Sequence, residues 1–240
     1  MSIIARPAGR TPRAAHLFYP GIALAAVAVV VVGFARTYYL RGYFFPQRLP
    51  LLLQLHGLVF SSWVLLLLVQ SSLVATSRTH LHRRLGIAGA VIAGLVVVLG
   101  VTTALVSARR DVAGGSTAAL TFLVIPFADM LVFGILVGAA FYYRRRSDVH
   151  KRLMLLATTA LLGAAFARWP LSVMSSGAVA FFVATDLFVA ALWLHDLASR
   201  RRLHPASVWG GLLVLVSQPL RLAIGGTGAW LAVARALTAP

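Results

Sequence analysis

The stretch VLLLLVQSSLVATSRTHLHRRLGIAGAVIAGLVVVLG (64–100) places a short basic segment between two long apolar runs. An α-helix rises about 1.5 Å per residue, so about 20 apolar residues cross the roughly 30 Å hydrocarbon core of a membrane. The segment between the runs, THLHRRLG (79–86), carries two histidines and two arginines. The stretch therefore predicts two membrane-spanning helices joined by a basic turn.

Seven stretches of the chain meet this length requirement. They run approximately over residues 18–36, 50–75, 85–107, 117–142, 152–174, 177–197 and 206–234. Pro219 and GGTG (225–228) are expected to kink the last span or to end it early, leaving an interfacial tail. We therefore predict an all-α integral membrane bundle of about seven transmembrane helices, with a basic N-terminal segment (1–17) followed by a single seven-helix transmembrane domain (18–236).

The composition agrees with a membrane protein. Of the 240 residues, 60% are hydrophobic and 11% charged, which is too little polar surface for a soluble globule. The formal charge of +17 is spread in short clusters between apolar runs, so we expect no nucleic-acid partner. The chain has no cysteine, which excludes disulfides, thiolate metal sites and iron–sulfur clusters. Membrane lipids are the expected partners; a small-molecule ligand, an oligomer and a membrane-complex partner stay open.

Lys and Arg residues are unevenly divided between the two sides of the predicted bundle. Fourteen fall on the side of the N-terminus, including the connections around SRTHLHRR, RRRSDVHKR and SRRRLH, and six on the other side. Connections rich in Lys and Arg stay in the cytoplasm. We therefore expect a cytoplasmic N-terminus and an external C-terminus.

Four charged residues are predicted to lie within the membrane: Asp129, Arg168, Asp186 and Arg221. Each costs at least about 2.5 kcal/mol there unless it is paired or hydrated. The rise per residue places all four in the middle to outer half, with His56 at a comparable depth. One hypothesis is a set of structural salt bridges. The other is an outward-opening pocket in which the two arginines bind an anionic group while the histidine and the aspartates bind or relay a proton.

Side chains that bind metal ions recur at the predicted cytoplasmic ends of the spans. They are His80, His82, His150, His195, Asp196 and His204. Three or four converging nitrogen and oxygen ligands would hold zinc or another divalent metal, with His82, His150, His204 and Asp196 as the candidate ligands. The alternative is that these basic helix ends contact lipid phosphates. No HExxH or HxxxH pair falls on one helix face, so the spacing leaves both open.

Haem b is disfavoured by the depth of the histidines. A bis-histidine haem in a helical bundle needs two histidines on facing helices at one depth, and His56 alone lies well inside the membrane. We therefore predict no cofactor, with a divalent metal as the alternative. The GxxxG pair Gly134 and Gly138 is expected to bring helices together within the bundle, or else between copies of the chain.

Six motifs together resemble an uncharacterised family of bacterial polytopic membrane proteins. They are TYYL (37–40), LHGLVFSSWVLL (55–66), LHRRLG (81–86), HKRLMLLAT (150–158), RLHPAS (202–207) and SQPLRL (217–222). The resemblance extends from Tyr38 to Trp230 and implies a multi-pass protein of the bacterial inner membrane. A more distant likeness to cytochrome b561-like bundles lacks the second intramembrane histidine of that pattern.

Three hypotheses for function remain at this point, and they do not decide whether the chain is an enzyme. The first is binding or transport of a small anionic, proton-coupled or lipid ligand by His56, Asp129, Arg168, Asp186 and Arg221. The second is a metal- or haem-dependent membrane enzyme that uses the cytoplasmic histidines. The third is a structural or assembly subunit of a membrane complex.

Overall fold

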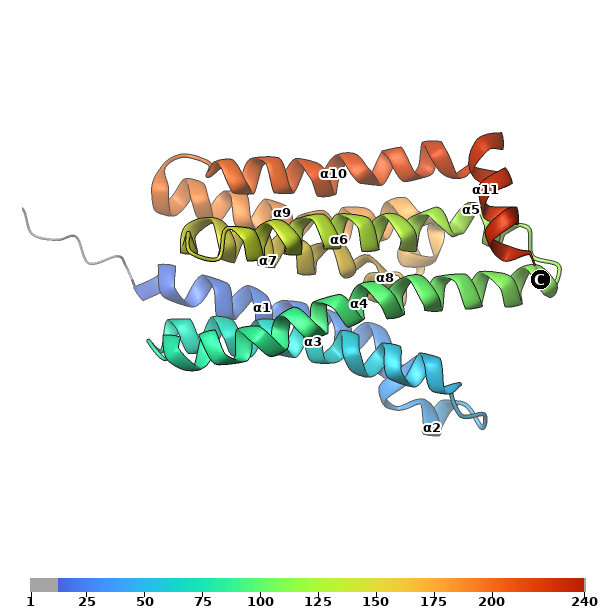
Figure 1. The fold of residues 1–240 in the computed structure, drawn as a ribbon, viewed down its shortest axis with the longest axis horizontal. Helices are drawn as coiled ribbons and strands as arrows, with labels where there is room; N and C mark the ends of the chain where they lie inside the picture. The colour runs from blue at the N-terminus through green and yellow to red at the C-terminus, as the bar shows by residue number, and fades with distance from the viewer. Residues whose placement is uncertain (1–12, 240) are drawn as a thin grey trace, which may run out of the picture.

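Every regular element of residues 13–239, the part of the chain that the computed structural model describes, is helical. The elements are α1 (Arg13–Phe34), the π-helix η1 (Ala35–Tyr39), α2 (Arg41–Phe44), α3 (Leu51–Ala75), α4 (Thr79–Ala113), α5 (Ala118–Phe122), α6 (Val124–Tyr142), α7 (Ser147–Leu161), α8 (Gly163–Phe166), the 3₁₀ helix η2 (Ser172–Ser176), α9 (Ala178–Arg200), α10 (Pro205–Gly225) and α11 (Gly228–Thr238). The long helices lie roughly alongside one another (Figure 1). The predicted all-α bundle is confirmed.

Seven segments within residues 13–239 are long and apolar enough to cross a membrane. They are Leu17–Tyr39, Leu51–Ala75, Thr79–Ala113, Ala118–Tyr142, Ser147–Phe166, Ala178–Arg200 and Pro205–Gly225. This number agrees with the sequence prediction and fits a multi-pass membrane protein. Most of the predicted basic N-terminal segment, residues 1–12, lies outside the described residues, and α1 begins at Arg13.

The predicted boundaries differ from the structure at three places. THLHRRLG is helical, because α4 begins at Thr79 and the turn from α3 is made by residues 76–78. The fifth span ends at Phe166 rather than near residue 174, since Pro170 disfavours helical backbone at the residue before it. The seventh continues through Pro219 and ends at Gly225 rather than at residue 234, so the early end predicted from GGTG is confirmed. The Thr227 hydroxyl then caps α11 by accepting from the Trp230 amide at 3.2 Å.

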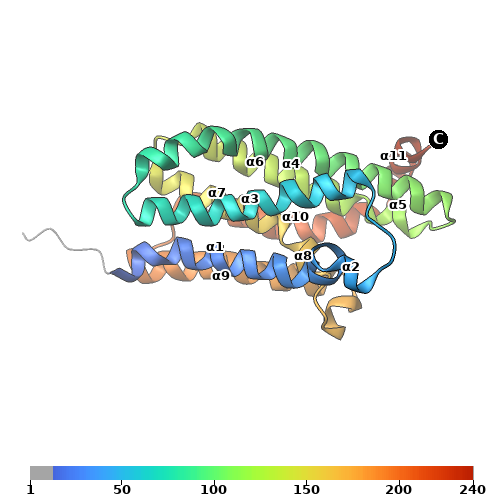
Figure 2. The same ribbon diagram turned by 90° about the horizontal axis from the view of Figure 1, so that it is seen from below.

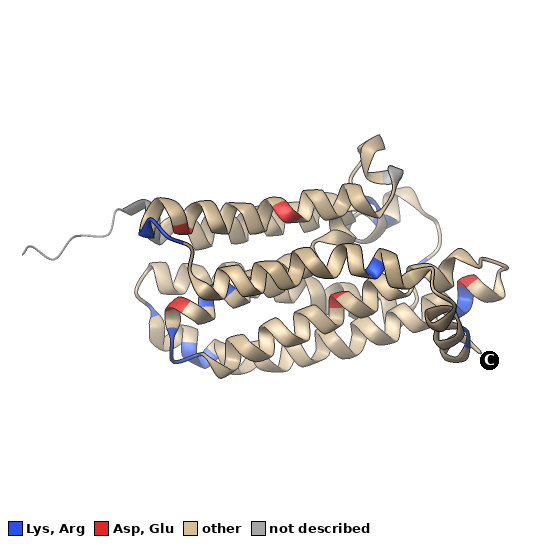
Figure 3. Ribbon diagram, turned by 90° about the horizontal axis from the view of Figure 1, so that it is seen from above, with Lys and Arg blue, Asp and Glu red and all other residues tan. Residues whose placement is uncertain are grey.

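The two ends of the bundle differ in composition. The basic end holds the start of α1 and the α3–α4, α6–α7 and α9–α10 turns, and Lys and Arg gather there (Figure 3). The opposite end holds α2, α5 and η2. There α11 lies across the ends of the spans, and Trp230 Nε1 donates to the Leu120 carbonyl at 2.9 Å (Figures 1 and 2).

The core is centred on α7, which packs against α6, α9 and α10. Leu153, Leu156 and Ala157 on α7 are completely buried. Trp63 of α3 is also buried, and its Nε1 donates to the Thr158 hydroxyl of α7 at 3.1 Å. Because the polar side chains of α10 face this core, they find partners inside the protein instead of lipid.

Glycines allow close helix contact at Gly33 but not at the GxxxG pair. A Cβ at Gly33 would lie 2.2 Å from the backbone oxygen of Ala165, so α1 and α8 touch backbone to backbone. At Gly134 and Gly138 no heavy atom lies within 4 Å of the position a Cβ would take. The prediction that this pair packs within the bundle is therefore wrong, because α6 turns these glycines outward.

Candidate functional site

A buried ion pair joins α6 to α10 in the middle of the bundle. The Arg221 side chain is only 4% exposed, and its Nη1 donates to Asp129 Oδ1. Nη2 donates to the Ser217 hydroxyl one turn earlier at 2.9 Å, and the guanidinium lies 5.5 Å from the centre of the Phe182 ring. Nε is buried without a hydrogen-bond partner among the described residues. The guanidinium is thus neutralised by one carboxylate, and its buried Nε–H stays unpaired among the described residues.

A second polar contact lies beside this pair, between α9 and α10. Gln218 Nε2 donates to Asp186 Oδ1 at 2.7 Å. Gln218 is buried, whereas Asp186 is half-buried. Because Gln218 comes three residues before Arg221, one face of α10 serves both aspartates.

Two hollows adjoin Arg221. A small cavity of about 10 Å³ is lined by residues that include Asp129, Thr185, Gln218 and Arg221. That volume is close to the space one water molecule requires. A larger cleft of about 390 Å³ lies between α5, α6 and α10. Its lining consists of Ala118, Thr121, Phe122, Val124, Ile125, Arg221, Leu222 and Gly225, so Arg221 is the one charged residue in a mostly apolar wall.

The structure separates the five predicted ligand-binding residues into two groups. Asp129 is paired with Arg221, and Asp186 lies beside this pair, bound to Gln218 on the same face of α10. His56 lies on α3, where its ring stacks on Phe60 at 4.1 Å and its Nδ1 is buried without a partner among the described residues. Arg168 is exposed beyond α8; its Nη1 donates to the Ala164 carbonyl at 2.6 Å, and its guanidinium lies over the Phe34 ring.

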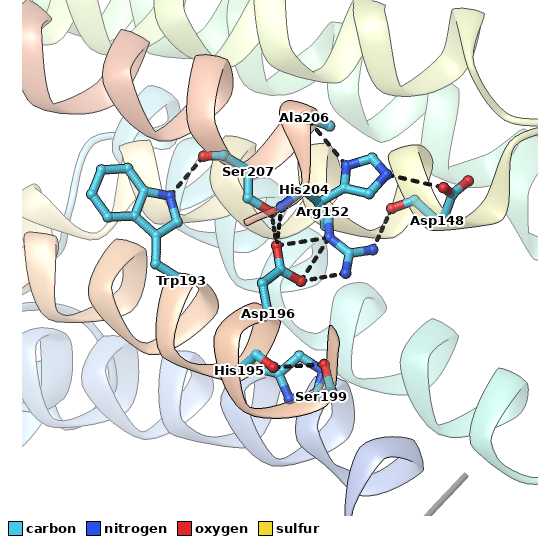
Figure 4. A network of polar contacts seen from close by, with 9 residues as sticks. All are labelled: Asp148, Arg152, Trp193, His195, Asp196, Ser199, His204, Ala206 and Ser207. Atoms are coloured by element: carbon cyan, nitrogen blue, oxygen red, sulfur yellow. Dashed lines mark hydrogen bonds and ion pairs between the residues drawn. The ribbon is translucent and has the colours of Figure 1, made fainter. Parts of the chain in front are cut away.

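At the basic end, a second buried ion pair joins α7 to α9 (Figure 4). Arg152 Nη2 donates to Asp196 Oδ1, and these two side chains are 2% and 0% exposed. Asp196 Oδ2 also accepts from the Ser207 hydroxyl at 2.6 Å and from the His204 amide at 3.1 Å. The carboxylate therefore binds the start of α10 as well as α7.

His204 extends this network to Asp148. Its Nδ1 accepts from the Ala206 amide at 3.1 Å, which caps the start of α10. A nitrogen that accepts carries no proton, so Nε2 bears the hydrogen and donates it to Asp148 Oδ2 at 3.0 Å. The same lone pair cannot both cap the helix and bind a metal ion.

The four predicted metal ligands form two separate pairs. Asp196 and His204 share the network of Figure 4. The rings of His82 and His150 lie 6.3 Å apart, and His150 Nδ1 is hydrogen-bonded to the Ala140 carbonyl at 2.8 Å. Across residues 13–239, no group of three or more His, Cys, Asp or Glu side chains is arranged to hold a metal ion. The metal site stays a prediction without a converged set of ligands.

Comparison with known proteins identifies no relative. No protein-family model matches the chain, and no curated protein or solved structure is significantly similar to it. The resemblance to a bacterial polytopic family therefore stays a prediction, and function has to be argued from the geometry of the site.

Several important partners are missing from the sequence prediction. Ser217 and Gln218 lie four and three residues before Arg221, the spacing that places side chains on one helix face. Arg152 lies at one of the basic helix ends for which contact with lipid phosphates is the alternative hypothesis, but its side chain is buried and binds Asp196. Its carboxylate partner Asp196 lies 44 residues later on another helix, so no local spacing signals this pair.

Proposed function

We propose that this multi-pass protein binds an amphipathic anion, an acidic group attached to an alkyl chain, in the cleft beside Arg221. The observation that carries the proposal is a cleft of about 390 Å³ with an almost wholly apolar lining that includes one charged residue, Arg221. Apolar clefts with a few well-placed polar groups are typical ligand sites. The alkyl chain lies along the side chains of α5, α6 and α10, and the acidic group reaches Arg221.

Binding of the anion is coupled to a proton. Arg221 is neutralised by Asp129, so an anion gains little from the intact pair. When Asp129 takes up a proton, the site becomes cationic and the guanidinium is free to bind the ligand. One proton therefore enters with each anion. In the predicted orientation, the cleft lies at the external end of a bacterial inner-membrane protein, and the ligand comes from the outer leaflet.

Calorimetric titration of the purified protein in nanodiscs with oleate tests the proposal. The same titration in two buffers of different ionisation enthalpy counts the protons taken up. We expect about one proton per oleate, and binding about tenfold or more tighter than that of oleyl alcohol, because hydrogen bonds to charged groups contribute about 1.5–3 kcal/mol. Dodecyl phosphate in place of oleate distinguishes a phosphate headgroup from a carboxylate.

Two substitutions separate the roles of the pair. D129N leaves Arg221 without a countercharge, so oleate binds without proton uptake. The double variant D129N/R221Q keeps an amide pair in place of the ion pair and loses the preference for oleate over oleyl alcohol. If this folded double variant binds oleate as the wild type does, the proposal is wrong.

A substitution in the cleft wall tests its location. Ala118 is exposed and lines the cleft. A118F fills part of the volume and weakens oleate binding. Ala236 on α11 is also exposed but lies outside the lining, so A236F serves as the matched control and leaves binding unchanged.

A further inference from the structure

Among the described residues, Asp186 is the one acidic residue that is paired with neither an arginine nor a histidine. The chain has five acidic residues, all aspartates, and all lie within the described residues. The other four are paired: Asp111 with Arg110, Asp129 with Arg221, Asp148 with His204 and Asp196 with Arg152. Asp186 accepts one hydrogen bond from the neutral amide of Gln218.

The position of Asp186 is deep in the membrane. It is the ninth of the 23 residues of α9, roughly 12 Å from the start of the helix. Its neighbours Val183 and Leu187 are 59% and 65% exposed and face outward from the bundle. The carboxyl group therefore lies at the edge of the α9–α10 contact, next to lipid hydrocarbon.

Among the side chains that the structure describes on the packed elements, no ionisable group is free to neutralise it. The elements packed against α9 are α1, α7, α8, α10 and η2. Their ionisable residues are Arg221 on α10; Asp148, His150, Lys151 and Arg152 on α7; and Arg13, His16 and Tyr19 on α1. Arg221 is bound to Asp129, and the residues on α7 and α1 all lie near the basic end. Arg168, which follows α8, faces Phe34.

We propose that Asp186 is a proton-binding site within the membrane, and that it holds its proton at neutral pH. A carboxylate without a countercharge is costly in hydrocarbon, and protonation removes that charge. Oδ1 accepts from Gln218 in the manner of an acid carbonyl. Oδ2 has no hydrogen-bond partner among the described residues and carries the proton. A proton-binding carboxyl of this kind is typical of membrane proteins that move protons.

This site is distinct from the proposed anion site. Arg221 lines the cleft, and neither Asp186 nor Gln218 does. Gln218 lines the small cavity that also touches Asp129, so the two sites adjoin without sharing a charged residue. Either proposal can fail while the other holds.

Labelling with a hydrophobic carbodiimide tests the inference on the full chain in liposomes. Dicyclohexylcarbodiimide partitions into hydrocarbon and reacts with protonated carboxyl groups. The acid O–H adds across one C=N bond, which places the proton on nitrogen and the carboxyl oxygen on carbon. Migration of the acyl group from oxygen to nitrogen then gives a stable N-acylurea, so the peptide gains the mass of the whole reagent and nothing is released.

We expect the adduct at pH 7 on Asp186, located by mass spectrometry, with at least tenfold less at pH 10. D186N abolishes it, and because Asn retains the oxygen that Gln218 binds, this variant is expected to fold. D111N, at an exposed ion pair near the opposite end, is the matched control and leaves the adduct unchanged. Absence of the adduct on Asp186 in the folded wild-type protein at pH 7 overturns the proposal.

A second arm distinguishes a proton from a metal cation. At constant pH and ionic strength, Na⁺ is exchanged for K⁺ during labelling. Equal labelling supports a proton site. Protection of Asp186 by either ion shows a cation site and overturns the proton assignment.

Discussion

Replacement of Asp196 by leucine removes the centre of the network at the basic end. The Arg152 guanidinium, 2% exposed, then loses its countercharge inside the protein. Removal of one partner of a buried ion pair costs about 3–5 kcal/mol. The His204 amide also loses its acceptor, and a buried unsatisfied donor costs about 1–3 kcal/mol. Because such costs overlap, we expect D196L to lower the free energy of unfolding by about 4 kcal/mol or more.

The double variant R152M/D196L tests whether the charge is the cause. It replaces both charges by apolar side chains of similar size, so no uncompensated charge remains. We expect it to recover most of the loss and to be within about 2 kcal/mol of the wild type. D111A removes an exposed ion pair and is expected to change stability by less than about 0.5 kcal/mol.

Reversible unfolding in mixed micelles by increasing dodecyl sulfate, followed by far-ultraviolet circular dichroism, measures these differences. Two results would refute the reasoning. One is a D196L protein within about 1 kcal/mol of the wild type, since a buried charge left alone costs more than that. The other is a double variant no more stable than D196L, which would mean that the network is held by something other than the ion pair.

Two further predictions concern packing and orientation. G33A places a methyl group against the Ala165 backbone and is expected to lower the free energy of unfolding by about 1–3 kcal/mol in the same assay. G134A has open space around it and is expected to leave that free energy unchanged. Equal effects of the two substitutions would contradict the α1–α8 contact. The chain has no cysteine, so S147C at the basic end and S116C at the opposite end can each be labelled alone with a membrane-impermeant maleimide. In intact cells we expect S116C to be labelled and S147C not to be. The reverse pattern would invert the predicted topology.

The sequence predicts the number and approximate course of the spans because hydrocarbon thickness sets the length of an apolar run. It places helix ends less well, because these depend on local backbone chemistry. Residues 79–84 show this: they are polar enough to lie outside hydrocarbon, yet they form the first turns of α4. Polarity predicts where a span leaves the membrane and not where its helix begins.

The candidate site is predicted only in part, for a related reason. Depth along a helix follows from the rise per residue, so Asp129, Asp186 and Arg221 are correctly placed near one level. The side of a helix on which a residue finds its partner depends on which helices are its neighbours, and one sequence does not reveal those neighbours. His56 is predicted at a comparable depth but lies on α3, whereas Asp129 and Arg221 meet where α6 packs against α10.

Both ion pairs act on α10, and this explains why its polar residues fall at two separated levels. Ser207 binds Asp196 near the start of the helix, and Arg221 binds Asp129 fourteen residues later, roughly 21 Å along the axis. Between them, a Cβ at Gly210 would lie 2.8 Å from the Leu156 side chain, so α10 packs tightly on α7. The two anchors hold different helices, and α10 cannot slide along its axis without breaking one of them. In the proposed anion complex, Arg221 exchanges Asp129 for the ligand, while the Gln218–Asp186 hydrogen bond and the buried carboxylate at the basic end keep α10 in place.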